Sequence, residues 1–188
     1  MKDHVSIQGS GPNATTLIGT SARSGISAES AIITTAEDSS IGGLKLENIG
    51  GGLQSIGIYI ERFTSSSAIE SIEIEVSGAN SSSVGIFDDG ALIATRIHNI
   101  DISVIGGRAG TRNSGILVVS GNGNYSDVSI NIRGGTGSEN IGFNSGGADS
   151  TMKLPAASKI YSVASHGKFN PRTRFNSMLT ALCTLIYC

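Results

Sequence analysis

The sequence predicts an all-β protein: a parallel β-helix (solenoid) of about six coils, followed by a non-repetitive C-terminal tail. Two observations predict this fold. Apolar residues and glycines recur in a repeat of about 28 residues, and each recurrence contains a stretch in which apolar and polar residues alternate. The composition agrees, because 188 residues with 26 glycines and only 5% aromatic residues favour short strands and tight turns over a helical bundle.

Four columns of residues define the repeat, and successive members of each column are one full repeat apart. They are Ile41, Ile69, Ile97 and Tyr125; Leu44, Ile72, Ile100 and Val128; Leu46, Ile74, Ile102 and Ile130; and Gly50, Gly78, Gly106 and Gly134. Parallel strands stack about 4.8 Å apart, so the members of one column should lie directly above each other, the apolar ones inside. A β-sandwich is the alternative all-β fold, but it does not require a constant register.

Each coil is expected to contribute two strands. The first strand alternates apolar and polar residues in 44–47, 72–75, 100–103 and 128–131, which is typical of a strand with one buried face. The second strand is predicted in 56–60, 84–87, 114–118 and 141–143, and its spacing slips at the longer connection 107–113. Residues 5–11, 15–19 and 30–34 fit the scheme more loosely and would add one to two coils at the beginning.

The composition changes near residue 150, which divides the chain into a β-helix over 1–149 and a basic tail over 150–188. The first part has a net charge of −7 and the second +5, together −2. The tail contains no acidic residue and one of the 26 glycines, Gly167. It is therefore expected to leave the 28-residue register and to serve as a cap, an interface arm or a loose appendage.

Composition also excludes several classes of protein. A net charge of −2 does not provide the basic surface that a nucleic-acid partner requires. The two cysteines, Cys183 and Cys188, both lie at the C-terminal end of the tail, so the body is neither a disulfide scaffold nor a cysteine-ligated metal domain. No signal peptide follows Met1, and the longest apolar run, 178–187, is too short to span a bilayer. We therefore expect a protein released without a classical signal, or a piece of a longer one.

Residues 5–19 (VSIQGSGPNATTLIG) resemble the opening coil of right-handed parallel β-helix proteins of the pectin-lyase-like superfamily, and 41–48 and 55–60 resemble their middle coils. The resemblance covers about residues 4–148. The superfamily includes pectate lyases, pectin methylesterases, polygalacturonases and phage tailspikes. The resemblance implies a polysaccharide or cell-surface glycan as ligand, an extracellular or virion-associated location, and a homo-oligomer, which would be a trimer in a tailspike-like protein.

The motifs that would select one activity within this superfamily are mostly absent. Of the polygalacturonase motifs only Asp88-Asp89 has a counterpart, whereas Gly-His-Gly and Arg-Ile-Lys are missing. The Gln-Asp pair of the methylesterases is absent, and no segment reproduces the calcium-binding Asp cluster of the lyases. The resemblance therefore implies a fold and a ligand class without selecting a reaction.

Four carboxylates are the catalytic candidates: Glu47, Glu73, Glu75 and Asp101. Alternation directs them outward, and the register stacks Glu47 under Glu75 and Glu73 under Asp101. Carboxylates on adjacent strands would lie about 4.8 Å apart, and carboxylates two positions apart along one strand about 6.6 Å apart. These values bracket the distances between the paired carboxyl groups that glycoside hydrolysis uses. The alternative is a solvated outer face that keeps the sheet soluble, with Lys45 at the end of one ladder compensating part of the charge.

The ligand-binding candidates lie elsewhere. Asp88 and Asp89, close to Glu61, would either form an ordinary turn or bind Ca²⁺ through their oxygens. Arg108 and Arg112 belong to the enlarged connection and could hold the carboxylate of an anionic sugar. The aromatic candidates for a sugar platform in the coils are Tyr59, Phe87 and Tyr125, the last expected inside.

Two functional hypotheses remain open. The first is a carbohydrate-interacting β-helix, a polysaccharide-degrading or tailspike-like segment, in which hydrolysis by paired carboxylates is favoured over lyase chemistry. The second is a non-catalytic structural or adhesive β-helix module. Short loops and scarce aromatic residues favour the second hypothesis. No other cofactor or metal is predicted.

Overall fold

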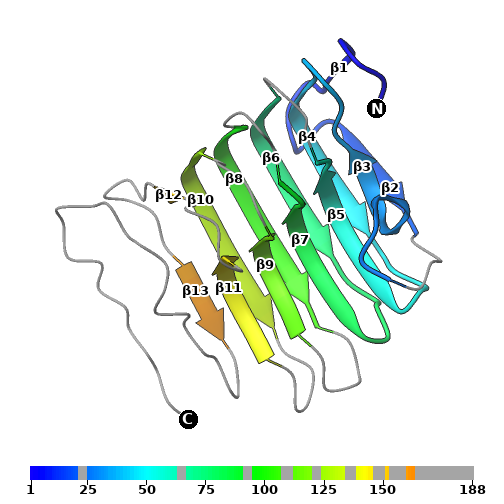
Figure 1. The fold of residues 1–188 in the computed structure, drawn as a ribbon, viewed down its shortest axis with the longest axis vertical. Helices are drawn as coiled ribbons and strands as arrows, with labels where there is room; N and C mark the ends of the chain where they lie inside the picture. Colours follow the sequence, from blue (N-terminus) through cyan, green and yellow to red (C-terminus); the bar gives the residue numbers. More distant parts are fainter. Residues whose placement is uncertain are drawn as a thin grey trace, which may run out of the picture.

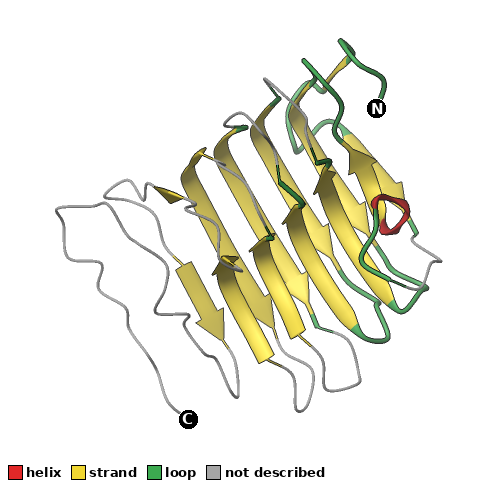
Figure 2. Cartoon of the chain, in the orientation of Figure 1, coloured by secondary structure: helices red, strands yellow, loops and turns green. Residues whose placement is uncertain are grey.

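The computed structural model describes residues 1–20, 25–62, 67–90, 95–106, 112–119, 124–133, 139–145, 151–152 and 160–163. Strands dominate this part of the chain (Figure 2), and its single helical element is a 3-10 turn, η1 (Ala28–Ser30). Every strand pairing in it is parallel. The prediction of an all-β parallel solenoid is therefore confirmed.

The strands form two sheets between which the chain alternates (Figure 1). Sheet A follows the order β1 (Ser6–Gln8), β4 (Ser40–Asn48), β6 (Ala68–Val76), β8 (Arg96–Ile105), β10 (Asn124–Arg133) and β12 (Thr151–Met152), with β2 (Thr16–Gly19) beside β4 and β13 (Ile160–Val163) beside β10. Sheet B contains β3 (Ala31–Thr34), β5 (Gln54–Ile60), β7 (Ser82–Asp88), β9 (Arg112–Val118) and β11 (Glu139–Ser145).

The described residues contain four complete coils, β4–β5, β6–β7, β8–β9 and β10–β11, so the expectation of about six was too high. The difference arises at the beginning of the chain. Both β1 and β2 pair with β4, β1 with its first half and β2 with its second half. Strands β1, β2 and β3 therefore belong to one incomplete coil, because β1 and β2 lie side by side on the same strand β4 and the turn between them projects from it.

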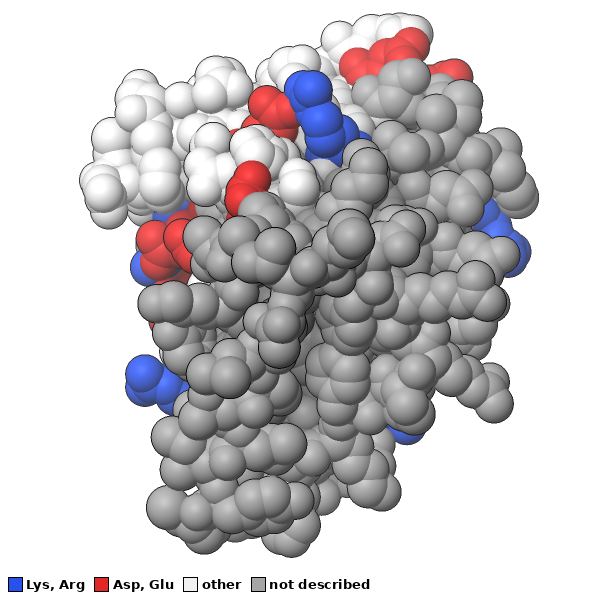
Figure 3. Space-filling view, turned by 90° about the vertical axis from the view of Figure 1, so that its left-hand side faces the viewer, with Lys and Arg blue, Asp and Glu red and all other residues white. Residues whose placement is uncertain are grey.

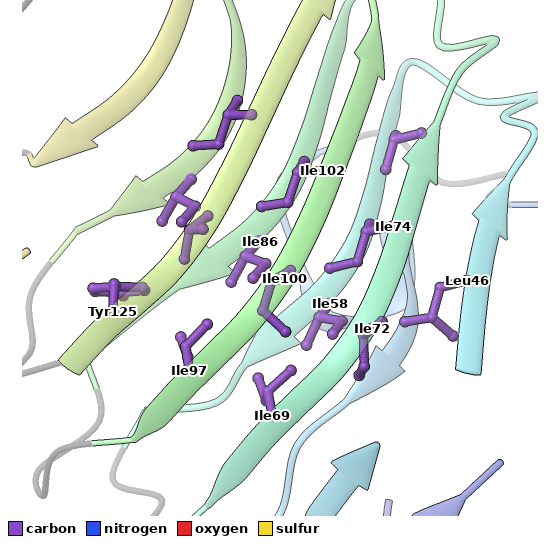
Figure 4. Packing of buried hydrophobic residues seen from close by; sticks show 14 of the residues in the cluster. Leu46, Ile58, Ile69, Ile72, Ile74, Ile86, Ile97, Ile100, Ile102 and Tyr125 are labelled. Atoms are coloured by element: carbon purple, nitrogen blue, oxygen red, sulfur yellow. The ribbon is translucent and has the colours of Figure 1, made fainter. Parts of the chain in front are cut away.

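The predicted interior column is confirmed. Leu46, Ile74, Ile102 and Ile130 are direct register partners on successive strands of sheet A, and each side chain is at most 2% exposed. Figure 4 shows Leu46, Ile74 and Ile102 in a row, facing Ile58 and Ile86 from sheet B. A single apolar core thus fills the space between the two sheets.

A bend interrupts each long strand of sheet A. Ile41 and Leu44 both point inward although they are an odd number of positions apart, which simple alternation does not allow. The residue before Leu44 explains this: Gly43 and its equivalents have positive φ, between 51° and 61°, and drop out of the pairing ladder. These equivalents, one on each following coil, are Ser71, Asn99 and Asp127. One left-handed residue per coil bends the strand and resets its alternation.

A glycine has a corresponding role in sheet B. A Cβ at Gly57 would lie 2.4 Å from Cγ2 of Ile74 and 2.6 Å from the carbonyl oxygen of Gly85, so no side chain fits. Gly57 and Gly85 are also skipped in the pairing of β5 with β7. As a result Ile56 leaves the main core and joins a second apolar cluster with Val84 and Phe87, on the outer side of sheet B.

The C-terminal strands continue sheet A without keeping the register. In β12, Thr151 pairs with Asn124, which is slightly less than a full repeat away. In β13, Ile160 pairs with Ile130, which is slightly more than a full repeat away. The expected cap at 178–187 and both cysteines lie outside the described residues. The boundary at residue 150 and the role of the tail therefore remain predictions.

Replacing Ile74 by Asp should prevent folding. The substitution places a charge without a partner between Leu46 and Ile102, at a cost of about 3–5 kcal/mol, which is comparable with the whole stability of a domain, about 5–15 kcal/mol. Ile74→Val is the matched control and should cost about 1 kcal/mol. Circular dichroism and urea unfolding would measure both; a cooperatively folded Ile74→Asp protein would contradict the stacked core.

Candidate functional site

The carboxylates predicted to be catalytic surround a lysine. Nζ of Lys45 lies 2.7 Å from Oε1 of Glu47, 2.9 Å from Oε2 of Glu75 and 3.5 Å from Oε1 of Glu73. The lysine side chain is 20% exposed and the three glutamates are 26–40% exposed, so the cluster is partly screened from water. Three of the four candidate carboxylates are thus brought together, and a cation lies among them.

The register of sheet A explains this arrangement. Lys45 pairs with Glu73, and Glu47 pairs with Glu75, on the adjacent strands β4 and β6. All four side chains therefore point outward from a small area of the sheet. The hydrogen bonds to Glu47 and then to Glu75 raise the pKa of Lys45 well above its ordinary value, so the ammonium stays charged in neutral solution. The cluster retains a net negative charge, because three carboxylates share one ammonium.

Asp101 lies beside this cluster as the register partner of Glu73 on β8, and its side chain is exposed. Together with Glu73 it lines a shallow hollow of about 120 Å³ on the outer face of sheet A. The hollow lies over the bend of the strands. The residues that line it are Pro12, Ser71, Ile72, Glu73, Asn99 and Asp101.

Pro12 reaches the hollow because the turn between β1 and β2 packs tightly on β4. The amide of Gly11 donates to the carbonyl of Gly43 over 2.6 Å. A Cβ at Gly43 would lie 2.6 Å from the carbonyl oxygen of Gly9, so this approach requires glycine. At the bend, Nδ2 of Asn99 donates to Oγ of Ser71 over 3.1 Å. Sequence reasoning did not identify Pro12, Ser71 or Asn99, because alternation says nothing about a left-handed residue or a projecting turn.

Asp88 and Asp89 point in opposite directions. Asp88 is fully buried and accepts hydrogen bonds from the hydroxyl of Tyr125 over 2.7 Å and from the amide of Gly90 over 3.1 Å. Asp89 instead accepts a hydrogen bond from the hydroxyl of Tyr59 over 2.8 Å. The structure therefore places the Asp88 side chain in the interior.

The sequence contained a signal for the buried pair. Asp88 is the register partner of Ile60 and Val118, and Tyr125 is the partner of Ile97, so each is a polar exception in an apolar column. Burial, together with the charge of Asp88, raises the pKa of Tyr125 well above its ordinary value. Tyr125 is buried as expected.

The remaining ligand-binding candidates do not join the carboxylate cluster. Tyr59 lies on the outer side of sheet B, where its ring stacks on Phe87 with centroids 5.1 Å apart and an angle of 13°. Burial and the hydrogen bond to Asp89 raise the pKa of Tyr59 to about 12. Arg112 begins β9 of sheet B and is exposed, whereas Arg108 lies outside the described residues.

His98 contacts two groups that resemble a catalytic set. Its Nδ1 lies 3.0 Å from Oγ of Ser126 and 3.1 Å from Oδ2 of Asp127. A Ser-His-Asp relay requires the serine and the carboxylate to use opposite ring nitrogens. Here both contact the same nitrogen, so the three residues do not form that relay.

Charges of both signs are interspersed on the described surface. Arg96 pairs with Glu70 on the strand next to it, as Lys45 pairs with its glutamates. Figure 3 shows acidic and basic side chains next to one another on the side it displays.

Within the described ranges, no three His, Cys, Asp or Glu side chains are grouped to hold a metal ion. The calcium hypothesis therefore remains a prediction. None of the helices among these residues has the length and hydropathy of a membrane span.

Tyr125→Phe should destabilise the protein by about 1–3 kcal/mol, because a buried carboxylate loses a donor. The folded pKa of Tyr125 lies above the unfolded value of about 10, so this stabilisation is present below pH 10 and is lost as the pH rises beyond it. The difference in unfolding free energy between the wild type and Tyr125→Phe, measured with urea, should therefore be smaller in alkali than at pH 7. Tyr59→Phe, which loses a less buried hydrogen bond, should cost less, and equal costs would argue against the special role of the interior pair.

Lys45→Met should destabilise the protein at pH 7 by about 1–2 kcal/mol, more than the loss of an isolated exposed pair, because three carboxylates then repel one another. The deficit in unfolding free energy should shrink in high salt, because salt screens the repulsion between partly exposed charges. Lys45→Arg keeps the cation and should remain close to the wild type. A Lys45→Met protein as stable as the wild type at pH 7 would show that the lysine does not compensate the cluster.

Comparisons with protein-family models, with curated proteins and with solved structures find no match to this chain. The similarity to the pectin-lyase-like superfamily therefore remains a resemblance in sequence pattern. What the structure establishes is a parallel β-helix with a partly charge-compensated cluster and a shallow hollow on the outer face of sheet A.

Proposed function

We propose that this chain is a non-catalytic, adhesive or structural β-helix module that contacts a polysaccharide through the outer face of sheet A. The position of Lys45 carries the proposal. A hydrolase needs one carboxyl group to protonate the glycosidic oxygen and a second to act as nucleophile or base. Glu47 and Glu75 instead both hold the same ammonium, within 2.9 Å, so their oxygens are engaged in a structural ion pair.

The shape of the face also supports binding without catalysis. Enzyme sites are usually concave and bury most of a small ligand, whereas the hollow here is shallow, with a volume of about 120 Å³. Successive coils present polar side chains in two outer columns, so a polymer lying along the solenoid would meet polar groups on each coil. Weak contacts that recur along the solenoid can add to a useful avidity.

The oligomeric state and the location belong to the same proposal. An adhesive module would meet polysaccharide outside the cell or on a virion, and association of several copies would multiply its contacts. A homotrimer is the form that a tailspike-like assembly would take. These expectations come from the resemblance in sequence.

Hydrolysis is the second candidate function, and one observation favours it. Glu73 and Asp101 both border the hollow, and Glu73 lies 3.5 Å from Lys45, farther than the other two glutamates. This pair would be the catalytic carboxylates if the protein cleaves a glycan.

One experiment separates the two functions. The wild-type chain would be screened on a glycan array and incubated with the polysaccharides that it retains, while new reducing ends are measured. We expect retention without cleavage, and unchanged retention for Glu75→Gln. If the wild type releases reducing ends and the Glu73→Gln and Asp101→Asn variants do not, the protein is a hydrolase and the non-catalytic function is wrong. Retention of no glycan would contradict the polysaccharide contact itself.

A further inference from the structure

We propose that the hollow over the bend of sheet A binds a neutral, hydroxyl-rich sugar unit and rejects acidic sugars such as uronates. This inference rests on the polysaccharide contact proposed above and assigns it to one place and one class of ligand. The hollow combines acceptors, a hydroxyl group and apolar surface, contributed by the N-terminal turn and by strands β6 and β8.

The hydrogen-bonding groups of the hollow are suited to hydroxyl donors. The carboxylates of Glu73 and Asp101 only accept hydrogen bonds when ionised, and they lie on adjacent strands as register partners. Asn99 uses Nδ2 to donate to Ser71, which leaves its Oδ1 as another acceptor and the Ser71 hydroxyl as a donor. Neighbouring hydroxyl groups of a sugar ring can donate to such acceptors while accepting one bond in return. Charged acceptors make the stronger hydrogen bonds of this kind.

The hollow also has apolar surface. Pro12 contributes this surface, and its ring is held in place by the packing of its turn on Gly43, whereas Ile72 is 2% exposed and belongs to the core. The C–H groups of a sugar ring can pack on such surface while its hydroxyls face the polar groups. A small ion would gain nothing from Pro12.

Charge decides between neutral and acidic sugars. The one lysine near the hollow among the described residues, Lys45, is already shared by three glutamates. A uronate bound here would place its carboxylate close to Glu73 and Asp101, and like charges at such short range near a protein surface repel strongly enough to lower affinity by at least about tenfold. Arg112, which the sequence suggested as the partner of an anionic sugar, begins a strand of sheet B and does not line the hollow.

The test compares neutral and acidic ligands on the full chain. Isothermal titration and saturation-transfer NMR would use neutral gluco-, galacto- and manno-oligosaccharides, an oligogalacturonide of the same length, and CaCl₂ alone. We expect binding of at least one neutral oligosaccharide and binding of the oligogalacturonide that is at least tenfold weaker. Asp101→Ala should weaken neutral binding at least tenfold, and Asp101→Lys should shift the preference toward the oligogalacturonide.

Glu37→Ala is the matched control, because it also removes an exposed carboxylate, but from the connection between β3 and β4, which is not a strand of sheet A and does not line the hollow. It should bind like the wild type, and the melting temperatures of all variants would confirm folding. Equal or tighter wild-type binding of the oligogalacturonide, or neutral binding unchanged in a folded Asp101→Ala protein, would overturn the inference while leaving a polysaccharide contact in place. Binding of Ca²⁺ that requires Asp101, without sugar binding, would make the hollow a cation site. Binding of no oligosaccharide would remove the proposed function together with the inference.

Discussion

Parallel hydrogen-bonded stacking of one coil on the next is the constraint on which the rest of this structure depends. Once the strands pair in parallel at about 4.8 Å, a strand residue stacks on its register partner in the preceding coil. All members of such a column therefore share the same environment, inside or outside the solenoid. Inside, this favours the isoleucine, leucine and valine columns, because similar shapes pack densely between the two sheets. Outside, it brings charged residues of neighbouring coils into contact.

The same constraint explains why polar exceptions in this solenoid have partners in nearby coils. Asp88 interrupts an apolar column, and Tyr125, which interrupts another, donates to it. Glu73 and Glu75 stack beside Glu47, and Lys45 compensates them. Asn99 donates to Ser71 one coil earlier. For the glutamates, stacking creates the electrostatic problem and also brings the compensating lysine within reach. The hydrogen bond from Tyr125 to Asp88 instead joins sheet A to sheet B across the interior.

This compensation bears directly on function. A row of carboxylates on a sheet can provide acid-base chemistry when one group remains available to exchange a proton with a substrate. Here the ammonium of Lys45 engages the glutamates, and a hollow of about 120 Å³ lies beside them. Our proposal is that this face holds a surface ligand, and the projecting turn of Pro12 forms one wall of the hollow.

The sequence by itself determined the solenoid, its 28-residue register and the inward or outward direction of the residues near Leu46 and Ile74, because period-two alternation and a constant repeat are local properties of the chain. It also identified Glu47, Glu73, Glu75 and Asp101 as one outer patch. Only the tertiary structure decided how many coils the described residues contain, since whether β1 and β2 make one strand layer or two depends on which part of β4 each pairs with. It also decided that Asp88 points inward, that Lys45 lies among three carboxylates, and that a bend and a projecting turn create the hollow. These features depend on backbone conformations and on side-chain contacts between coils, which a pattern of apolar and polar residues does not encode.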